Sequence, residues 1–166
     1  MNPFQSLRDY ELFVYTLPQQ FQNVESSTLV VARRGRLFAE VTGELIFGSG
    51  HRLFVYERLV LDTGTVKIEG YSYEAWRGSE KLYWYDSQPH PNDPGLARTH
   101  PHHQHIPPDI RHNRIPAPAL SFTQTNLQVL VQEIVGIQEA EKISIPLRGE
   151  PSVSPHKARR KRTSRK

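Results

Sequence analysis

The segment from residue 28 to residue 86 is a series of short stretches in which apolar and polar side chains alternate, separated by glycine-containing turns. Such alternation is typical of strands with one buried face, because successive side chains of a strand point to opposite faces. We expect about five strands, over residues 28–34, 36–47, 52–61, 65–77 and 80–86. Turns this tight join antiparallel neighbours, so the segment predicts an antiparallel meander.

A helix is expected on each side of these strands. A capping-box pattern starts at Ser6, and the apolar stripe that follows it ends at Pro18. A second helix is expected over residues 124–136, with Thr123 as its cap and Gly136 at its end. The sequence therefore predicts an α+β fold in which both helices cover one face of the meander.

Residues 87–118 hold eight of the 13 prolines and six of the eight histidines. Because proline fixes φ and removes a backbone donor, this composition excludes a regular helix or a central strand. We expect a long His/Pro-rich loop here. Loops of this length in compact domains are usually functional or disordered.

The net charge of +4 is unevenly distributed. Residues 147–166 hold eight basic residues and one acid, net +7, so residues 1–146 hold 13 bases and 16 acids, net −3. We expect a domain over residues 1–146 and a basic, disordered tail over 147–166. The tail could hold nucleic acid electrostatically, without sequence specificity.

The chain has no cysteine, which excludes disulfides, thiolate metal sites and cysteine nucleophiles. It has no long apolar run, and its N-terminal residues lack a secretory pattern. We therefore expect a cytoplasmic protein that does not associate with a membrane.

Candidate catalytic residues gather where the last expected strand enters the His/Pro-rich loop. They are Tyr85, Asp86, His90, His102, His103 and His105. Histidine acts as acid or base near neutral pH, so two histidines flanking a phosphodiester could move both protons without a metal. If the segment is extended, His103 and His105 point to one side and His102 to the other. A solvated connector without chemistry explains the composition equally well.

The same histidines leave a metal site as an alternative. Two histidines on one side suit a metal ion, and His90 or Asp86 could supply a third ligand. We favour this less, because neither a cysteine nor a clear pair of acidic ligands accompanies the histidines. The expectation is therefore no cofactor, with a divalent metal as the alternative.

Glu57 stands between Val55 and Leu59, in the apolar face of its strand. A carboxylate in that position is partly buried, which raises its pKa unless it is paired. Glu57 could act as a general base or orient a histidine. The structural alternatives are an ion pair with an arginine of a neighbouring strand, or a place at a wet strand edge.

Several stretches together resemble the TumE family, whose members are toxin components of bacterial and archaeal toxin–antitoxin pairs. They are YSYEAW at 71–76, YWYDSQPH at 83–90 and THPHHQH at 99–105, supported by GHRLFVYE at 50–57. The resemblance extends over about residues 5–136. Ser87 and Gln104 stand where the family often has Asn and Lys, and the missing Lys removes one phosphate contact.

The resemblance implies a small cytoplasmic protein that inhibits growth and acts on RNA. It also implies a helix-turn-helix antitoxin encoded nearby. The motif positions carried over from the family are Tyr85, Asp86, His90, Pro101, His102, His103 and His105, with Glu57 upstream.

We expect a ribonuclease in which His103 and His105 act as acid and base. Asp86 and His90 would orient them or bind phosphate, while Glu57 would contribute from the sheet. Two alternatives stay open. One is a metal-dependent hydrolase that uses the same histidines, and the other is a non-enzymatic module that binds nucleic acid or protein.

Overall fold

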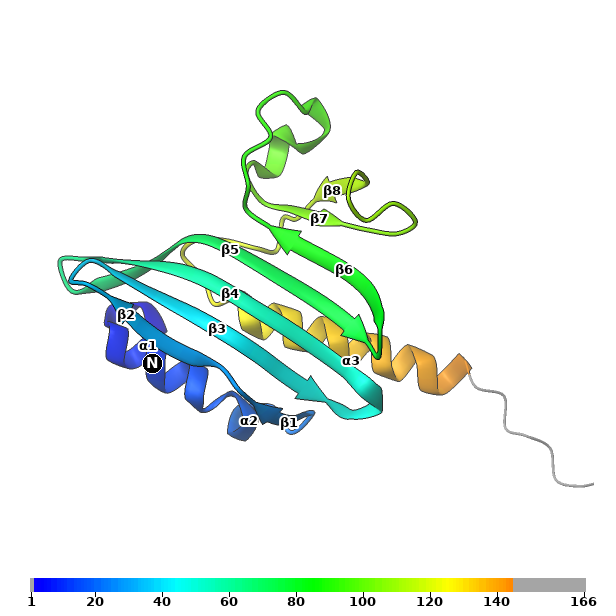
Figure 1. The fold of residues 1–166 in the computed structure, drawn as a ribbon, viewed down its shortest axis with the longest axis horizontal. Helices are drawn as coiled ribbons and strands as arrows, with labels where there is room; N and C mark the ends of the chain where they lie inside the picture. The colour runs from blue at the N-terminus through cyan, green and yellow to red at the C-terminus, as the bar shows by residue number, and fades with distance from the viewer. Residues whose placement is uncertain (1, 145–166) are drawn as a thin grey trace, which may run out of the picture.

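The expected strands assemble into one antiparallel sheet, which the rest of the chain extends at both edges (Figure 1). The structure is a computed structural model that describes residues 2–144. Its eight strands are β1 (Val24–Ser27), β2 (Val30–Arg34), β3 (Phe38–Phe47), β4 (His51–Asp62), β5 (Thr65–Arg77), β6 (Glu80–Asp86), β7 (His103–His105) and β8 (Arg114–Pro116). Their order is β1-β3-β4-β5-β6-β7-β8, and β2 also pairs with β3.

The helices come from the two ends of the described chain. They are α1 (Leu7–Tyr15), α2 (Leu17–Gln20) and α3 (Asn126–Ser144), with 3-10 turns at Pro3–Gln5, Gly48–Gly50 and Pro94–Thr99. Helices α1 and α3 lie on one face of the sheet, and their apolar side chains form the core with that face (Figure 1). We call the opposite face the open face, because no α-helix of residues 2–144 covers it. The predicted α+β class is confirmed.

The predicted count of about five strands is wrong, and residues 87–118 are not all loop. β7 contains no proline, and it pairs with the free edge of β6. β8 ends in Pro116 and is the edge strand of the sheet. Proline is tolerated in an edge strand, because its missing backbone N–H does not have to bond to a further strand. β1 was missed because only Val24 of its four residues is buried, which is too little alternation to detect.

The two expected helices form with altered ends. Ser6 caps α1 by accepting a hydrogen bond from the backbone N–H of Asp9, as the capping-box pattern predicts. α3 begins at Asn126 and continues through Gly136, where we expected it to end. It continues because its second half still packs: Ile137 contacts the core, and Gln138 donates a hydrogen bond to the Gly48 carbonyl. The basic tail expected over residues 147–166 lies outside the described residues.

The register of the central strands decides which side chains share a face. Tyr56, Ser72 and Asp86 are directly opposite one another across β4, β5 and β6. They lie on the open face, whereas the neighbouring Glu57 and Tyr71 are buried on the helix-covered face. Residues next to each other in sequence therefore serve opposite sides of the sheet.

Gly43 allows β3 to pass close to the segment before β2. Its φ is +135°, and a Cβ at this position would lie 2.5 Å from the carbonyl oxygen of Thr28. Only glycine adopts such a conformation and tolerates such an approach without a shift of the backbone.

Two glycine-to-alanine substitutions should change stability in opposite directions. Gly43→Ala should lower the free energy of unfolding by about 1–3 kcal/mol, because the new Cβ strains the backbone. Gly136→Ala should raise it by about 0.5–1 kcal/mol, since Gly136 lies inside α3 with open space around it. Urea denaturation measures both. A destabilised Gly136→Ala protein would contradict the continuous helix.

Candidate functional site

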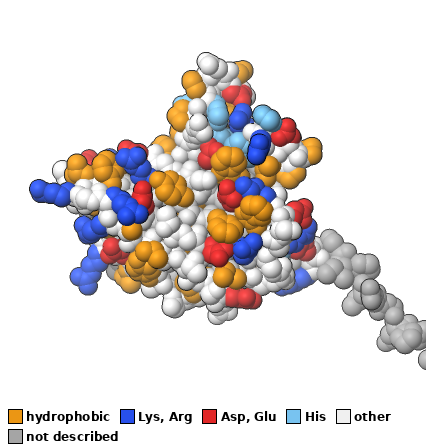
Figure 2. All heavy atoms as spheres, viewed as in Figure 1, with side chains coloured by type: hydrophobic (Ala, Val, Ile, Leu, Met, Phe, Trp, Pro, Cys, Tyr) orange, Lys and Arg blue, Asp and Glu red, His pale blue; other side chains and the backbone are white. Residues whose placement is uncertain are grey.

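An aspartate and two histidines converge on one point of the open face. β7 pairs with β6 so that His103 lies opposite Asp86. The Nε2 atom of His103 is 2.9 Å from Oδ1 of Asp86, and Nε2 of His105 is 3.3 Å from Oδ2. The two Nε2 atoms are 3.1 Å apart, and all three side chains are buried. We call these three residues the Asp–His–His cluster; histidines gather in the lobe above the sheet that contains it (Figure 2).

Backbone carbonyls fix the orientation of both imidazole rings. Nδ1 of His103 lies 3.0 Å from the carbonyl oxygen of Pro101, and Nδ1 of His105 lies 2.8 Å from that of Ile110. Because a carbonyl oxygen only accepts, both Nδ1 atoms carry hydrogen, and both Nε2 atoms face Asp86. The indole of Trp84 stacks on His105 with ring centroids 4.3 Å apart, which restricts that ring further.

Burial and pairing act against each other at the cluster. Burial by itself raises the pKa of Asp86, but hydrogen bonds from His103 and from the Gln88 N–H outweigh it and lower the pKa. Burial by itself lowers the pKa of His103, but its bonds to Asp86 and Pro101 raise it above its ordinary value. For His105, burial prevails over the attraction of Asp86, and the pKa is lowered. His103 is therefore the histidine of the cluster that most readily holds a positive charge.

His90 and Arg114 border the cluster. The half-buried ring of His90 lies against His103, with centroids 4.8 Å apart. Burial lowers the pKa of His90, as do the positive charges of Arg114 and His103. Arg114 lies in β8 directly opposite His105. The sequence did not point to Arg114, because nothing in its local sequence indicates that β8 pairs with β7.

Two of the expected site residues point away from the cluster. His102 lies with its Nδ1 atom 2.8 Å from the hydroxyl of Tyr71, and the two rings are stacked. Tyr85 donates a hydrogen bond to Glu133 of α3. Both face the helix side, which confirms that His102 points opposite to His103.

Glu57 is also on the helix-covered face rather than at the cluster. Its carboxylate accepts hydrogen bonds from the hydroxyls of Tyr10 at 2.5 Å and Tyr73 at 2.6 Å. The Tyr73 hydroxyl in turn accepts one from the Asn126 amide. Burial raises the pKa of Glu57, although the two hydroxyl donors lower it in part. The expected burial is confirmed, but the partners are two tyrosines and not an arginine.

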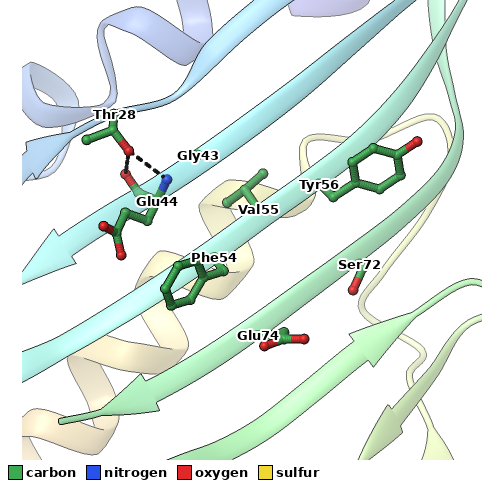
Figure 3. Close-up of a pocket in the computed structure, with 8 residues that line it drawn as sticks. All are labelled: Thr28, Gly43, Glu44, Phe54, Val55, Tyr56, Ser72 and Glu74. Atoms are coloured by element: carbon green, nitrogen blue, oxygen red, sulfur yellow. Dashed lines mark hydrogen bonds between the residues drawn. The ribbon is translucent and has the colours of Figure 1, made fainter. Parts of the chain in front are cut away.

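Two adjoining hollows on the open face lead to the cluster. The first is lined by residues that include Phe54, Tyr56, Ser72 and Glu74 (Figure 3). The second is lined by Tyr56 and Ser72 as well, and it reaches Trp84 and Asp86. The hollows share two lining residues and so adjoin each other, and the second borders the cluster at Asp86; we call the two hollows together the open-face groove.

The protein-family model for toxin TumE matches residues 14–138. The chain belongs to the TumE toxin family. The match confirms the resemblance seen in the sequence, and it spans all eight strands and the cluster. TumE membership supports a toxin role and implies an antitoxin partner. Comparisons with curated proteins and with solved structures find no match.

In the described part of the chain, no helix is both long and apolar enough to cross a membrane.

Glu57→Gln should make stability less dependent on pH. The pKa of Glu57 in the native protein is raised above the ordinary value of about 4.5. At a pH just above 4.5, native Glu57 therefore keeps its proton, whereas Glu57 of the unfolded chain has lost it. Between that value and the raised native pKa, wild-type stability should therefore fall by about 1.4 kcal/mol for each pH unit. The variant lacks this loss. Urea denaturation of both proteins from pH 4.5 to 8 measures the difference, and a constant difference would contradict the raised pKa.

Proposed function

We propose that this protein is the toxin of a toxin–antitoxin pair and acts on RNA as a ribonuclease, with the Asp–His–His cluster as its reaction centre. The convergence of buried Asp86, His103 and His105 at the end of the open-face groove carries the proposal. Membership of the TumE family supports the toxin role. We further propose that it inhibits growth from the cytoplasm and is neutralised by a helix-turn-helix antitoxin encoded nearby.

The residues around the cluster supply what RNA cleavage needs. Attack by a ribose 2′-OH requires a base, a phosphate with reduced negative charge, and a stabilised leaving oxygen. His90 suits the base, because its lowered pKa keeps it neutral near pH 7 and it sits at the rim. The cluster would stabilise the leaving 5′ oxygen, through a proton or a metal ion, and Arg114 would contact the phosphate.

The open-face groove supports a nucleotide as the substrate. Phe54 and Tyr56 line it, and Trp84 lines its end beside the cluster. Aromatic side chains stack with bases of any sequence, so these side chains suit a single strand of RNA. Arg58 lines the same groove, although it already forms an ion pair with Glu69. Electrostatic attraction by the eight basic residues of the tail would then add to stacking.

RNA cleavage should depend on the cluster and not on exposed histidines. We expect the full-length protein to cleave total cellular RNA, and the His103→Gln/His105→Gln variant to be at least about 100-fold slower. His112→Gln is the matched control, because His112 is exposed and its Nδ1 atom pairs with nearby Asp109. It should cleave like wild type and inhibit growth equally when expressed.

Asp86→Asn serves as a second variant, and thermal unfolding checks that each protein is folded. Equal cleavage by the wild type and by folded cluster variants would refute the cluster as the reaction centre. Intact RNA with every protein, together with RNA binding that the variants retain, would instead favour a non-enzymatic binding module.

A further inference from the structure

We infer that the Asp–His–His cluster is a binding site for one divalent transition-metal ion, such as Zn²⁺ or Mn²⁺. The ligands would be the Asp86 carboxylate and the Nε2 atoms of His103 and His105. The inference rests on the proposed function in one respect: it takes the ion to be the source of positive charge at the reaction centre. The geometry that carries it is independent of any substrate.

The donor atoms are spaced as metal ligands are. One potential ligand atom from each of the three residues lies within 4.8 Å of the others. The closest pairs are 2.9, 3.1 and 3.3 Å apart. Ligand atoms about 2.0–2.2 Å from a common ion, at tetrahedral or octahedral angles, are themselves about 2.8–3.6 Å apart. The cluster already has these separations, so an ion requires little rearrangement.

The orientation of the two rings directs both Nε2 atoms at Asp86, which suits a cation at this point. Both Nδ1 hydrogens are used in bonds to the carbonyls of Pro101 and Ile110. A neutral imidazole of that tautomer has only a lone pair on Nε2, and the Asp86 carboxylate also only accepts. When both rings are neutral, three acceptors therefore face one another in a buried place. A proton on Nε2 of His103 lets that ring donate to Asp86, but it leaves no hydrogen between Nε2 of His105 and Asp86, whereas a metal ion would take a lone pair from all three groups.

The groups around the cluster orient the ligands. Metal-bound histidines usually donate their second ring N–H to a carbonyl or a carboxylate, which fixes the tautomer and raises ligand basicity. Here both histidines do so. The backbone N–H of Gln88 holds Oδ1 of Asp86 at 2.9 Å, and Trp84 covers the face of His105. Each of the three ligands is thus positioned by at least one further contact.

The donor set and the charge indicate the kind of ion and its use. Two imidazole nitrogens with one carboxylate suit Zn²⁺ or Mn²⁺ better than Mg²⁺, which prefers oxygen ligands. A divalent ion would give the cluster a net charge of about +1, and Arg114 opposite His105 adds to it. Three protein ligands leave a coordination position for a phosphate oxygen or water from the groove. His90 lies outside this ligand set, against the ring of His103.

Metal titration of untagged, chelator-treated full-length protein tests the inference. Isothermal titration calorimetry with Zn²⁺ and with Mn²⁺ should show one site, and elemental analysis after gel filtration should find about one bound ion. Mg²⁺ should not compete. His103→Gln and His105→Gln should each weaken binding at least about 100-fold, while His112→Gln should bind like wild type. Bound Co²⁺ should give a visible spectrum that both cluster variants lose.

Circular dichroism checks that each variant is folded, and Asp86→Asn replaces any variant that is not. Binding that the folded cluster variants retain, or no binding of either ion by wild type, would overturn the inference. One metal ion bound without any RNA cleavage would uphold the metal site and refute the proposed ribonuclease. RNA cleavage by a wild-type protein that binds neither ion would do the reverse.

Discussion

The three-residue ladder between β6 and β7 is the contact on which the site depends. It places His103 opposite Asp86 and His105 opposite Trp84. On the open face, this alignment brings three polar groups into one buried cluster. Because strand pairing fixes the backbone positions, the side chains of Asp86, His103 and His105 are preorganised and need no binding partner to bring them together.

The opposite face of the same strands provides the support. The carboxylate of Glu57 joins Tyr10 of α1 to Tyr73 of β5, and Tyr73 is also bonded to Asn126 at the start of α3. Both helices are thereby tied to the centre of the sheet by buried hydrogen bonds, which impose more specific geometry than apolar contact alone. Tyr73 stacks on Tyr71, and Tyr71 stacks on and bonds to His102. The core network therefore ends one residue before the cluster.

Local patterns in the sequence were enough to predict the features that depend on neighbouring residues alone. Alternation predicted the strands that became β2 to β6, and the two-residue period placed His103 and His105 on one side and His102 on the other. The same alternation predicted the buried position of Glu57. It did not show that this position and Asp86 belong to opposite faces, because that requires the register across β4, β5 and β6.

Long-range pairing explains what the sequence did not reveal. Nothing within residues 103–105 shows that they join the edge of β6, and the surrounding prolines favour a loop. Arg114 and Trp84 were not assigned to the site for the same reason, since only the assembled edge places them beside His105. The sequence made a metal site the less favoured alternative, because neither a cysteine nor a clear pair of acidic ligands accompanies the histidines. In the structure one carboxylate and two imidazoles lie close together, and this is the observation on which the proposed metal site rests.

The protonation of the histidine rings tests the cluster most directly. Long-range ¹H–¹⁵N NMR spectra of the full-length protein at neutral pH report which ring nitrogens carry hydrogen. We expect hydrogen on Nδ1 of both His103 and His105, and a shift of their Nε2 resonances, but not those of His112, when Zn²⁺ is added. A bare Nδ1 atom on either ring, or Nε2 resonances that Zn²⁺ leaves unchanged, would contradict a single centre built from Asp86, His103 and His105.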